Sequence, residues 1–215
     1  GYKDAIEIGC GRGTIALYLR IYEKLSLVCN DNEESAINLA KNNFTYFNAD
    51  AKFVVSDASN LGLPDESLDM SVSIGLLEHL PNYDAILKEQ FRVLKSGGVM
   101  ISLNIPKKNS VQILNNLYRA VYRFFKPSYP LKPDYYRNSD MPADYIKNAL
   151  SVGFKDVYTV NVNPFPLFTP LHPVLERVMT PLYRTILFLR RIYLPYPFKT
   201  SYSLSQAHFL VGFKK

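Results

Sequence analysis

Apolar residues in the first half of the chain alternate between short continuous runs and stretches with helical spacing. The continuous runs predict five strands, at residues 5–8, 26–30, 52–56, 68–74 and 99–103. The helical spacing predicts three helices, at residues 14–22, 33–42 and 83–95. Strands that alternate with helices at short intervals are typical of βαβ units, so we expect a parallel sheet.

Polar residues and glycines suggest where two of these helices begin and end. Asn32 precedes two acidic residues and predicts an N-terminal cap for helix 33–42. Gly97 and Gly98 follow the last apolar position of helix 83–95 and predict its end.

The alternation loosens after Pro106. An amphipathic helix is expected at 111–125, and a loop rich in proline and tyrosine at 126–140. A helix at 143–150, a turn at Gly153, a strand at 155–160 and a final strand at 208–213 follow. The segment 161–205 between the last two strands is far longer than a hairpin requires, so it is an insertion.

The insertion contains a predicted helix at 174–193. Its arginines recur every seven residues on one stripe, and apolar residues form another stripe. These two sets are Arg177, Arg184 and Arg191, and Val178, Leu182, Ile186 and Leu189. Arg190 and Pro181 add to the evidence against a membrane span. The helix could lie at a membrane interface or line a groove, or it could pack on its own domain with solvated arginines.

Length and composition indicate one elaborated domain over residues 1–215, because 47% hydrophobic and 20% charged residues are globular proportions. Cys10 and Cys29 lie in apolar context, which predicts buried reduced thiols and favours a reducing compartment such as the cytoplasm. The chain opens at Gly1, just before a core strand, so we expect that the natural N-terminus lies further upstream.

Charge divides the chain near Pro106. Residues 1–105 hold 9 Lys and Arg against 14 Asp and Glu, a balance of −5, and residues 106–215 hold 16 against 5, a balance of +11. The second half also holds 12 of the 14 prolines. A basic, aromatic and proline-rich half predicts an anionic or amphiphilic partner.

The first candidate for chemistry is the glycine loop in DAIEIGCGRGTIALYL. Gly9, Gly11 and Gly13 follow the first strand, a pattern shared by dinucleotide sites and other nucleotide-like sites. Glu7 precedes the loop, and its carboxylate would repel a pyrophosphate but attract an ammonium group. This favours S-adenosylmethionine, which carries an ammonium and no phosphate.

Two further acidic residues follow predicted strands. Asp31 ends the second strand, near the distance from the loop at which a carboxylate grips ribose hydroxyls. Asp57 follows the third strand, where a carboxylate could accept from the adenine amine. Both features fit an adenosine-type ligand.

Four motifs in this order resemble the class I S-adenosylmethionine-dependent methyltransferases, including ubiquinone and menaquinone biosynthesis members. They are DAIEIGCGRG, LVCNDNEESAINLAKNN, VVSDASNLGLPDESLDMSVSIGLLEHLPN and EQFRVLKSGGVMISLNIP. The resemblance runs from about residue 4 to residue 106, returns in MPADYIKNALSVGFKDVYTV and is absent from 161–203.

The resemblance implies an α/β fold with a Rossmann-like, doubly wound, seven-stranded sheet. The sheet would be mostly parallel with its last strand antiparallel, and it would carry helical lid insertions. Residues 1–105 would bind the cofactor, 106–141 and 161–203 would form the lid and substrate-binding insertions, and 142–160 and 204–215 would close the fold. Both insertions leave from carboxyl ends of strands, the ligand side of such a sheet.

The resemblance also implies roles for individual residues. Glu7 and Gly9, with the backbone of Ile74, would meet the methionine part, Asp31 the ribose, and Asp57 with Ala58 the adenine. The full set of expected cofactor residues is Glu7, Gly9, Gly11, Gly13, Asp31, Asn32, Asp57, Ala58 and Ile74. No metal is expected. CND stands where Gly-Ile-Asp is commoner, but the acid is retained.

His79, in LLEHLP, falls where some relatives place groups near the methyl acceptor. It could act as a general base for a hydroxyl acceptor, or it could be part of a structural turn.

The first hypothesis for the acceptor is a small amphiphilic or lipid-like molecule, with peripheral contact at an anionic inner membrane surface. Apolar faces paired with Arg119, Arg123, Arg177, Arg184 and Arg191 suit an anionic head and an apolar body. A saccharide or another polar small molecule is the nearest alternative. Nucleic acid ranks lower because long apolar runs interrupt the basic residues. A non-catalytic relative of the fold and an NAD oxidoreductase are the alternatives of a different class, and the sequence predicts no oligomeric state.

Overall fold

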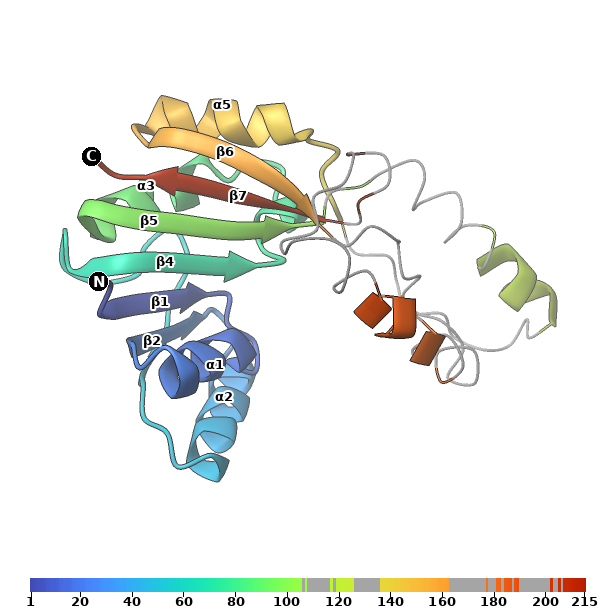
Figure 1. Cartoon of the computed structure of the whole chain (residues 1–215), viewed down its shortest axis with the longest axis horizontal. Helices are drawn as coiled ribbons and strands as arrows, with labels where there is room; N and C mark the ends of the chain where they lie inside the picture. Colours follow the sequence, from blue (N-terminus) through green and yellow to red (C-terminus); the bar gives the residue numbers. More distant parts are fainter. Residues whose placement is uncertain are drawn as a thin grey trace. The chain divides into compact units, whose positions relative to one another are not determined.

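A seven-stranded sheet in the order β3-β2-β1-β4-β5-β7-β6 organises the computed structural model (Figure 1). The strands are β1 Asp4–Ile8, β2 Ser26–Asp31, β3 Lys52–Val55, β4 Leu68–Ile74, β5 Leu94–Asn104, β6 Lys155–Val162 and β7 Ala207–Phe213. β1 to β5 pair in parallel, and β7 runs against its neighbours (Figure 1). The predicted fold class, with its antiparallel last strand, is confirmed.

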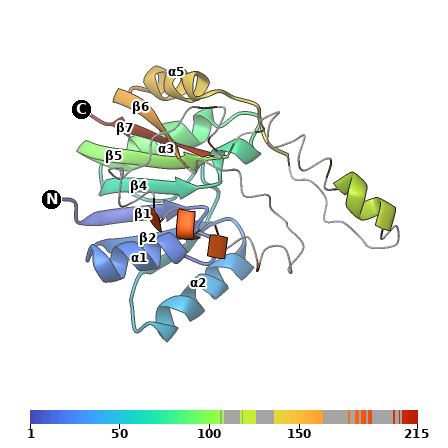
Figure 2. The same cartoon turned by 45° about the vertical axis from the view of Figure 1, so that its right-hand side comes forward.

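Helices cover both faces of the sheet (Figure 2). They are α1 Thr14–Tyr22, α2 Glu34–Tyr46, α3 Asp84–Val93 and α5 Pro142–Val152, with the short 3-10 turn η1 at Leu77–His79. Successive strand residues point to opposite faces. Ala5 therefore packs in the cluster under α1 and α2, whereas Ile6 packs in the cluster under α3 and α5. Burial on both faces explains why Ala5, Ile6 and Ile8 of β1 are all apolar, with Glu7 as the one buried charged residue of the strand.

The structure describes residues 1–105, 107, 117, 119–125, 136–162, 177, 181–182, 184–186, 188–189, 202, 205 and 207–215. The chain divides into two compact units. The first comprises Gly1–Pro106, Tyr136–Thr159 and Phe209–Lys215, and the second comprises Lys107–Tyr135 and Val160–His208.

Several expectations after Pro106 fall largely outside the described residues. Predicted helix 111–125 is helical at 117 and 119–125, and predicted helix 174–193 is helical at the residues described within it. Residues 126–135 of the predicted loop, and Arg190 and Arg191, lie outside the described residues. The lid role of 106–141 and 161–203 stays a prediction.

The predicted cap of α2 is wrong. The helix begins at Glu34, so Glu33 rather than Asn32 occupies the capping position, and no side chain caps it. Asp31 takes over part of this role, because its Oδ1 accepts from the Glu33 N–H at 3.1 Å. The strand thus ends one residue later than expected and shifts the helix start.

The predicted end of α3 at the glycine pair is also wrong. α3 ends at Val93, and Leu94 already has extended backbone and pairs with Leu68 of β4. The next pair is Met70 with Val99, so Gly97 and Gly98 lie in an irregular part of β5. A Cβ on Gly98 would meet two backbone oxygens, that of Lys95 at 2.8 Å and that of Asp69 at 3.2 Å. The glycines therefore permit a tight strand entry instead of stopping a helix.

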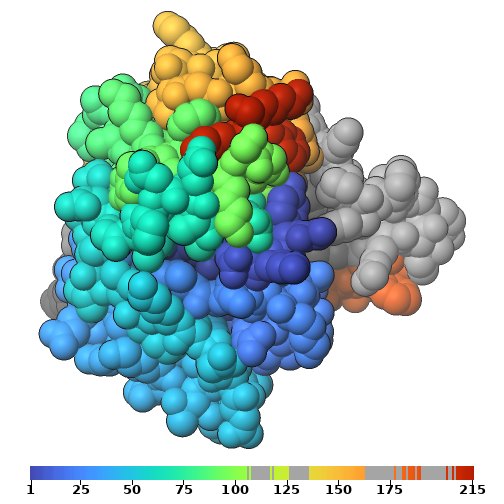
Figure 3. All heavy atoms as spheres, turned by 90° about the vertical axis from the view of Figure 1, so that its left-hand side faces the viewer, coloured from blue at the N-terminus to red at the C-terminus, as the bar shows by residue number. Residues whose placement is uncertain are grey.

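Other expectations agree with the structure. α1 and β4 have the predicted bounds, and Gly153 ends α5 with φ 122°. Cys10 and Cys29 are buried free thiols. A hydrogen bond with Cys10, together with burial, raises the pKa of the Cys29 thiol far above its ordinary value. Both ends of the chain lie on the side where β1 and β4 begin (Figure 1), and this side faces the viewer in Figure 3.

Candidate functional site

A cleft of about 260 Å³ lies where the first four strands end. The strand order reverses between β1 and β4, which is the point at which doubly wound sheets bind ligands. Its lining comes from segments far apart in the sequence: Gly9, Asn30, Asn32, Asp57, Ala58, Ser59, Leu76, Leu80, Asn82, Ala85 and Ile86. Four of the nine residues expected to hold the cofactor line this cleft: Gly9, Asn32, Asp57 and Ala58.

The glycine loop joins β1 to α1. Gly9, Gly11 and Gly13 all have positive φ, at 66°, 52° and 69°, a region that L side chains rarely adopt. Gly13 immediately precedes α1, and a Cβ there would lie 3.2 Å from the Ala40 Cβ and 3.3 Å from a Phe44 ring carbon. This glycine therefore lets α1 and α2 pack closely beneath the loop.

Glu7 lies at the end of β1 and is almost fully buried, with 4% of its surface exposed. Its Oε2 accepts from the Ala16 N–H in the first turn of α1 at 2.7 Å. Burial raises the pKa of Glu7 to about 7, the Ala16 N–H opposes this rise, and the Asp31 charge adds to it. Glu7 is thus a buried carboxyl that a nearby positive charge would ionise.

Asp31 ties the end of β2 to the glycine loop. Its Oδ2 accepts from the Gly11 N–H at 2.8 Å, and its Oδ1 accepts from the Glu33 N–H. Two backbone donors thus fix the carboxylate on the loop that it was expected to serve. Gly11, Gly13, Asp31, Glu7 and Ile74 are not among the residues that line the cleft.

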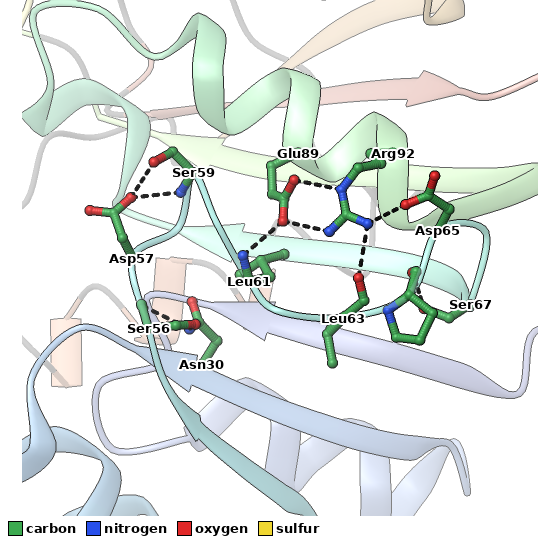
Figure 4. A network of polar contacts seen from close by, with 11 residues as sticks. Asn30, Ser56, Asp57, Ser59, Leu61, Leu63, Asp65, Ser67, Glu89 and Arg92 are labelled. Carbon is green, nitrogen blue, oxygen red and sulfur yellow. Dashed lines mark hydrogen bonds and ion pairs between the residues drawn. The ribbon is translucent and has the colours of Figure 1, made fainter.

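Asp57 begins the loop between β3 and β4 and projects beside Ser59 (Figure 4). Its Oδ1 accepts from the Ser59 N–H at 2.7 Å and from the Ser59 hydroxyl at 2.5 Å. These bonds, the hydroxyl first, lower the pKa of Asp57. The exposed carboxylate therefore stays ionised, with its second oxygen directed away from the serine (Figure 4).

A clamp on α3 holds the remainder of this loop (Figure 4). Glu89 is buried, and its Oε1 accepts from the Leu61 N–H at 2.7 Å. Arg92 grips the same carboxylate through two nitrogens, at 2.8 and 2.7 Å, and donates to the Leu63 carbonyl at 2.8 Å. Asp65 forms a further ion pair with Arg92. The loop that carries Asp57 is thereby fixed to a helix.

Sequence reasoning missed Asn30 as a cleft residue. Its side chain is buried at the end of β2 and donates to the Ser56 hydroxyl at 2.8 Å and to the Ser56 carbonyl at 3.0 Å (Figure 4). A polar amide directly after the apolar run of Leu27, Val28 and Cys29 was the available signal, because buried polar side chains are uncommon and are normally hydrogen-bonded. The apolar lining from Leu76, Leu80 and Ile86 gave no comparable signal.

His79 ends η1, the turn that follows β4. Its Nδ1 lies 2.8 Å from the Tyr136 carbonyl oxygen. Because a carbonyl only accepts, Nδ1 carries the proton of the neutral ring, and the ring's basic lone pair is on Nε2. The neighbouring Glu78 is buried, and burial raises its pKa. Its Oε1 accepts from the Ile105 N–H at 3.1 Å, which ties the turn to the end of β5.

The family described as "Methyltransferase domain" matches residues 6–102. Demethylmenaquinone methyltransferase of Staphylococcus haemolyticus is 30% identical over 128 residues, which is 58% of this chain and 52% of that protein. Fatty-acid O-methyltransferase of Mycolicibacterium smegmatis is 31% identical over 100 residues, 46% of this chain and 36% of that protein. The matched part of this chain therefore spans about half the length of the first relative and about a third of the second.

A solved structure, a SAM-dependent methyltransferase of Methanosarcina mazei, has the same fold. It is 19% identical, with a TM-score of 0.66 over 98% of this chain and 92% of that one. At this identity the likeness concerns the fold alone.

Proposed function

Residues 6–102 belong to the methyltransferase-domain family of class I, S-adenosylmethionine-dependent enzymes, and from this premise we propose that the chain methylates a small amphiphilic acceptor. The observation that supports this proposal is the cleft at the ends of β1 to β4. It gathers Gly9, Asn32, Asp57 and Ala58, which come from three motifs that are separate in the sequence. An adenosine-type cofactor needs contacts from all three.

We assign the cofactor contacts from the carboxyl ends of the strands. Asp31 would accept from the ribose hydroxyls, and Asp57 with Ala58 would contact the adenine. Glu7 would face the ammonium of the methionine part, whose charge would restore the ionised carboxylate. Gly9, Gly11 and Gly13 would let the loop backbone approach the ligand, with Asn32 and the Ile74 backbone at its edges.

The transfer itself asks for alignment more than for side-chain chemistry. The acceptor atom attacks the methyl carbon, the carbon–sulfur bond breaks, and its electron pair stays on sulfur, which leaves S-adenosylhomocysteine. For a hydroxyl acceptor, His79 Nε2 would take the proton. Effective molarities of ~10⁵ to 10⁸ M from alignment alone can supply most of the acceleration.

The described helical residues 117 and 119–125 favour an amphiphilic acceptor. At about 100° per residue, Leu117, Val121, Phe124 and Phe125 share one face, and Arg119 and Arg123 lie roughly opposite. All four apolar side chains are exposed. Among the described residues, no helix is both long and apolar enough to span a bilayer. We propose peripheral contact with an anionic membrane surface, as such a helix allows. The quinone and fatty-acid names of the two relatives point to the same class of acceptor.

Cofactor binding is tested by titration calorimetry with S-adenosylhomocysteine. The Asp31→Asn variant should bind at least about tenfold more weakly, because a charged hydrogen-bond acceptor for the ribose is lost. Asp50→Asn, at an exposed carboxylate paired with Arg20, is the control and should bind like the unmodified chain. A chain that binds neither S-adenosylhomocysteine nor S-adenosylmethionine would refute the proposal.

The acceptor is tested with S-adenosylmethionine labelled in its methyl group. Isoprenoid hydroquinones, fatty acids and sterols are offered beside saccharides of similar size. Label in the organic extract of the first set supports the amphiphilic class. Label confined to saccharides would overturn that class and keep methyl transfer.

A further inference from the structure

The turn that carries His79 is held by Asn138, a residue about sixty positions away in the sequence. The Asn138 backbone N–H donates to the Glu78 carbonyl at 2.7 Å. Its side-chain Nδ2 donates to the Leu77 carbonyl at 3.1 Å and to the Leu80 carbonyl at 3.2 Å. Asn138 therefore donates to three backbone carbonyls, two within η1 and one on the residue that follows it.

Asn138 is itself held in one orientation. It is buried, and its Oδ1 accepts from the Tyr145 hydroxyl at 2.9 Å. Tyr145 is fully buried on α5 and stacks on Tyr83, with ring centroids 5.1 Å apart and planes 14° from parallel. A flipped amide would turn Oδ1 toward two carbonyl oxygens, which excludes that orientation.

The same short segment contacts the imidazole directly. Tyr136, two residues before Asn138, supplies the carbonyl that accepts from His79 Nδ1–H. The Asn138 bonds fix the backbone of the turn, and the Tyr136 carbonyl fixes the ring that the turn carries. Glu78 adds a third tie, because its Oε1 accepts from the Ile105 N–H. The ring is thus anchored at its backbone and at Nδ1.

We infer that Asn138 is a positioning residue for His79, which holds the imidazole in the Nδ1–H tautomer with Nε2 as the proton acceptor. This inference rests on the proposed function, in which His79 takes the acceptor's proton. Residues 136–138 lie near the end of the predicted insertion 106–141, in the same compact unit as His79, so the segment that returns from the insertion also orients the base. Only the reaction with a hydroxyl acceptor needs this arrangement.

The test compares Asn138→Ala with Asn148→Ala as the matched control. Asn148 lies on α5, and its side-chain Nδ2 donates to the Tyr83 hydroxyl at 3.0 Å, which is outside η1. Nitrogen-15 NMR of the labelled imidazoles in mildly alkaline buffer reports the tautomer of His79. A His79→Gln sample assigns its signals.

Asn138→Ala should lower the fraction of the Nδ1–H tautomer and reduce kcat by roughly tenfold or more, within the range that a general base contributes. Affinity for S-adenosylhomocysteine should stay within about threefold, because the truncated side chain lies outside the cleft lining. Asn148→Ala should leave the tautomer fraction and kcat unchanged. Tyr145→Phe keeps the Asn138 donors but removes the hydroxyl that orients them, so it should shift the tautomer in the same direction by less.

A variant that lowers only the melting temperature, with the His79 tautomer and kcat of the unmodified chain, would overturn the inference. If Asn138→Ala does not fold, Tyr145→Phe decides by the same two readouts. The tautomer measurement needs no cofactor. A chain that binds no S-adenosylhomocysteine but shows the tautomer shift would thus defeat the proposed function while it supports the positioning of His79.

Discussion

Glu7 combines two demands on one carboxyl group. It is buried beneath the glycine loop, yet it accepts from the Ala16 N–H at the start of α1. Burial disfavours its charge more than that bond supports it, so its pKa rises from 4.5 to about 7. The neutral form of Glu7 is therefore favoured, and a cationic ligand group beside it would favour the ionised form instead.

The stability of the chain should carry the signature of this carboxyl. Between pH 4.5 and about 7, Glu7 still holds its proton in the folded chain but has lost it in the unfolded chain. The free energy of unfolding should therefore fall as pH rises through that window. The fall should be about 3 kcal/mol, and Glu7→Gln should remove it and be the more stable form above pH 7. Urea denaturation across pH measures both. Glu23→Gln, at an exposed carboxyl, is the control and should keep the same dependence of unfolding free energy on pH. If that dependence persists in Glu7→Gln, a group other than Glu7 causes it.

Gly13 and Gly11 separate backbone strain from packing. Both have positive φ, but a Cβ would meet Ala40 and Phe44 only at Gly13, and nothing within 4 Å at Gly11. Gly11→Ala should cost about 1 kcal/mol from strain, and Gly13→Ala about 3 kcal/mol because overpacking adds to it. Urea unfolding of the two variants measures the difference. Equal losses of unfolding free energy would mean that α2 moves aside at no cost to accommodate the added Cβ at Gly13.

At the scale of elements, the loop between β3 and β4 depends on a helix for its shape. Glu89 and Arg92 of α3 bind the loop at Leu61, Leu63 and Asp65 (Figure 4). The Glu89 carboxylate is buried, whereas Asp65 is 75% exposed at its side chain. The buried Glu89 carboxylate should contribute more to the unfolding free energy than the exposed Asp65 carboxylate, because water cannot replace a buried acceptor.

Removal of each carboxylate tests that ranking. Glu89→Ala leaves the Leu61 N–H and one side of Arg92 without an acceptor, so unfolding free energy should drop by about 2–3 kcal/mol. Asp65→Ala should change it by less than about 0.5 kcal/mol. Hydrogen exchange should also quicken at residues 57–63 in Glu89→Ala alone. Similar losses in both variants would show that the network acts as one unit.

The elements themselves followed from the sequence better than their junctions did. Short apolar runs predicted every strand that the structure describes, and apolar stripes at helical spacing predicted the α1, α2, α3 and α5 helices. Leu94 was misassigned because its apolar spacing fits the end of a helix as well as the start of a strand. The role of Asn138 could not be predicted at all, because its partners in η1 and at Leu80 lie 58 to 61 residues away. Contacts of that separation depend on topology and leave no local pattern.

At the scale of the whole molecule, the two halves of the sequence differ in charge. Residues 1–105 carry −5 and residues 106–215 carry +11, although the chain as a whole carries +6. Attraction to anionic surfaces therefore depends on the second half and should weaken with salt. The positive-φ glycines after β1 and the carboxylates at the strand ends could be singled out from the sequence because the loop chemistry is local, and their contacts with the cofactor stay a prediction. The acceptor could not, because it depends on residues with no fixed spacing.

Vesicle binding tests the proposed membrane contact. Phe124 and Phe125 form an exposed pair with ring centroids 5.3 Å apart, and Tyr46 and Phe47 form a similar exposed pair at 5.0 Å in the sheet-containing unit. Serine at both Phe124 and Phe125 should weaken sedimentation with anionic vesicles by at least about tenfold. Serine at both Tyr46 and Phe47 should not. Equal effects, or no salt-sensitive binding by the unmodified chain, would remove the membrane contact.

β7 comes last among the strands yet lies inside the sheet, between β5 and β6. During synthesis, β1 to β5 would therefore leave the ribosome long before β7, the neighbour that β6 needs, has been made. Until then β6 has no place on the sheet, and β5 presents an open edge to other chains. Such late closure links folding speed to contacts across most of the chain, which are slow to form. Substitutions in β7 should thus increase aggregation during synthesis before they measurably lower the stability of the folded chain.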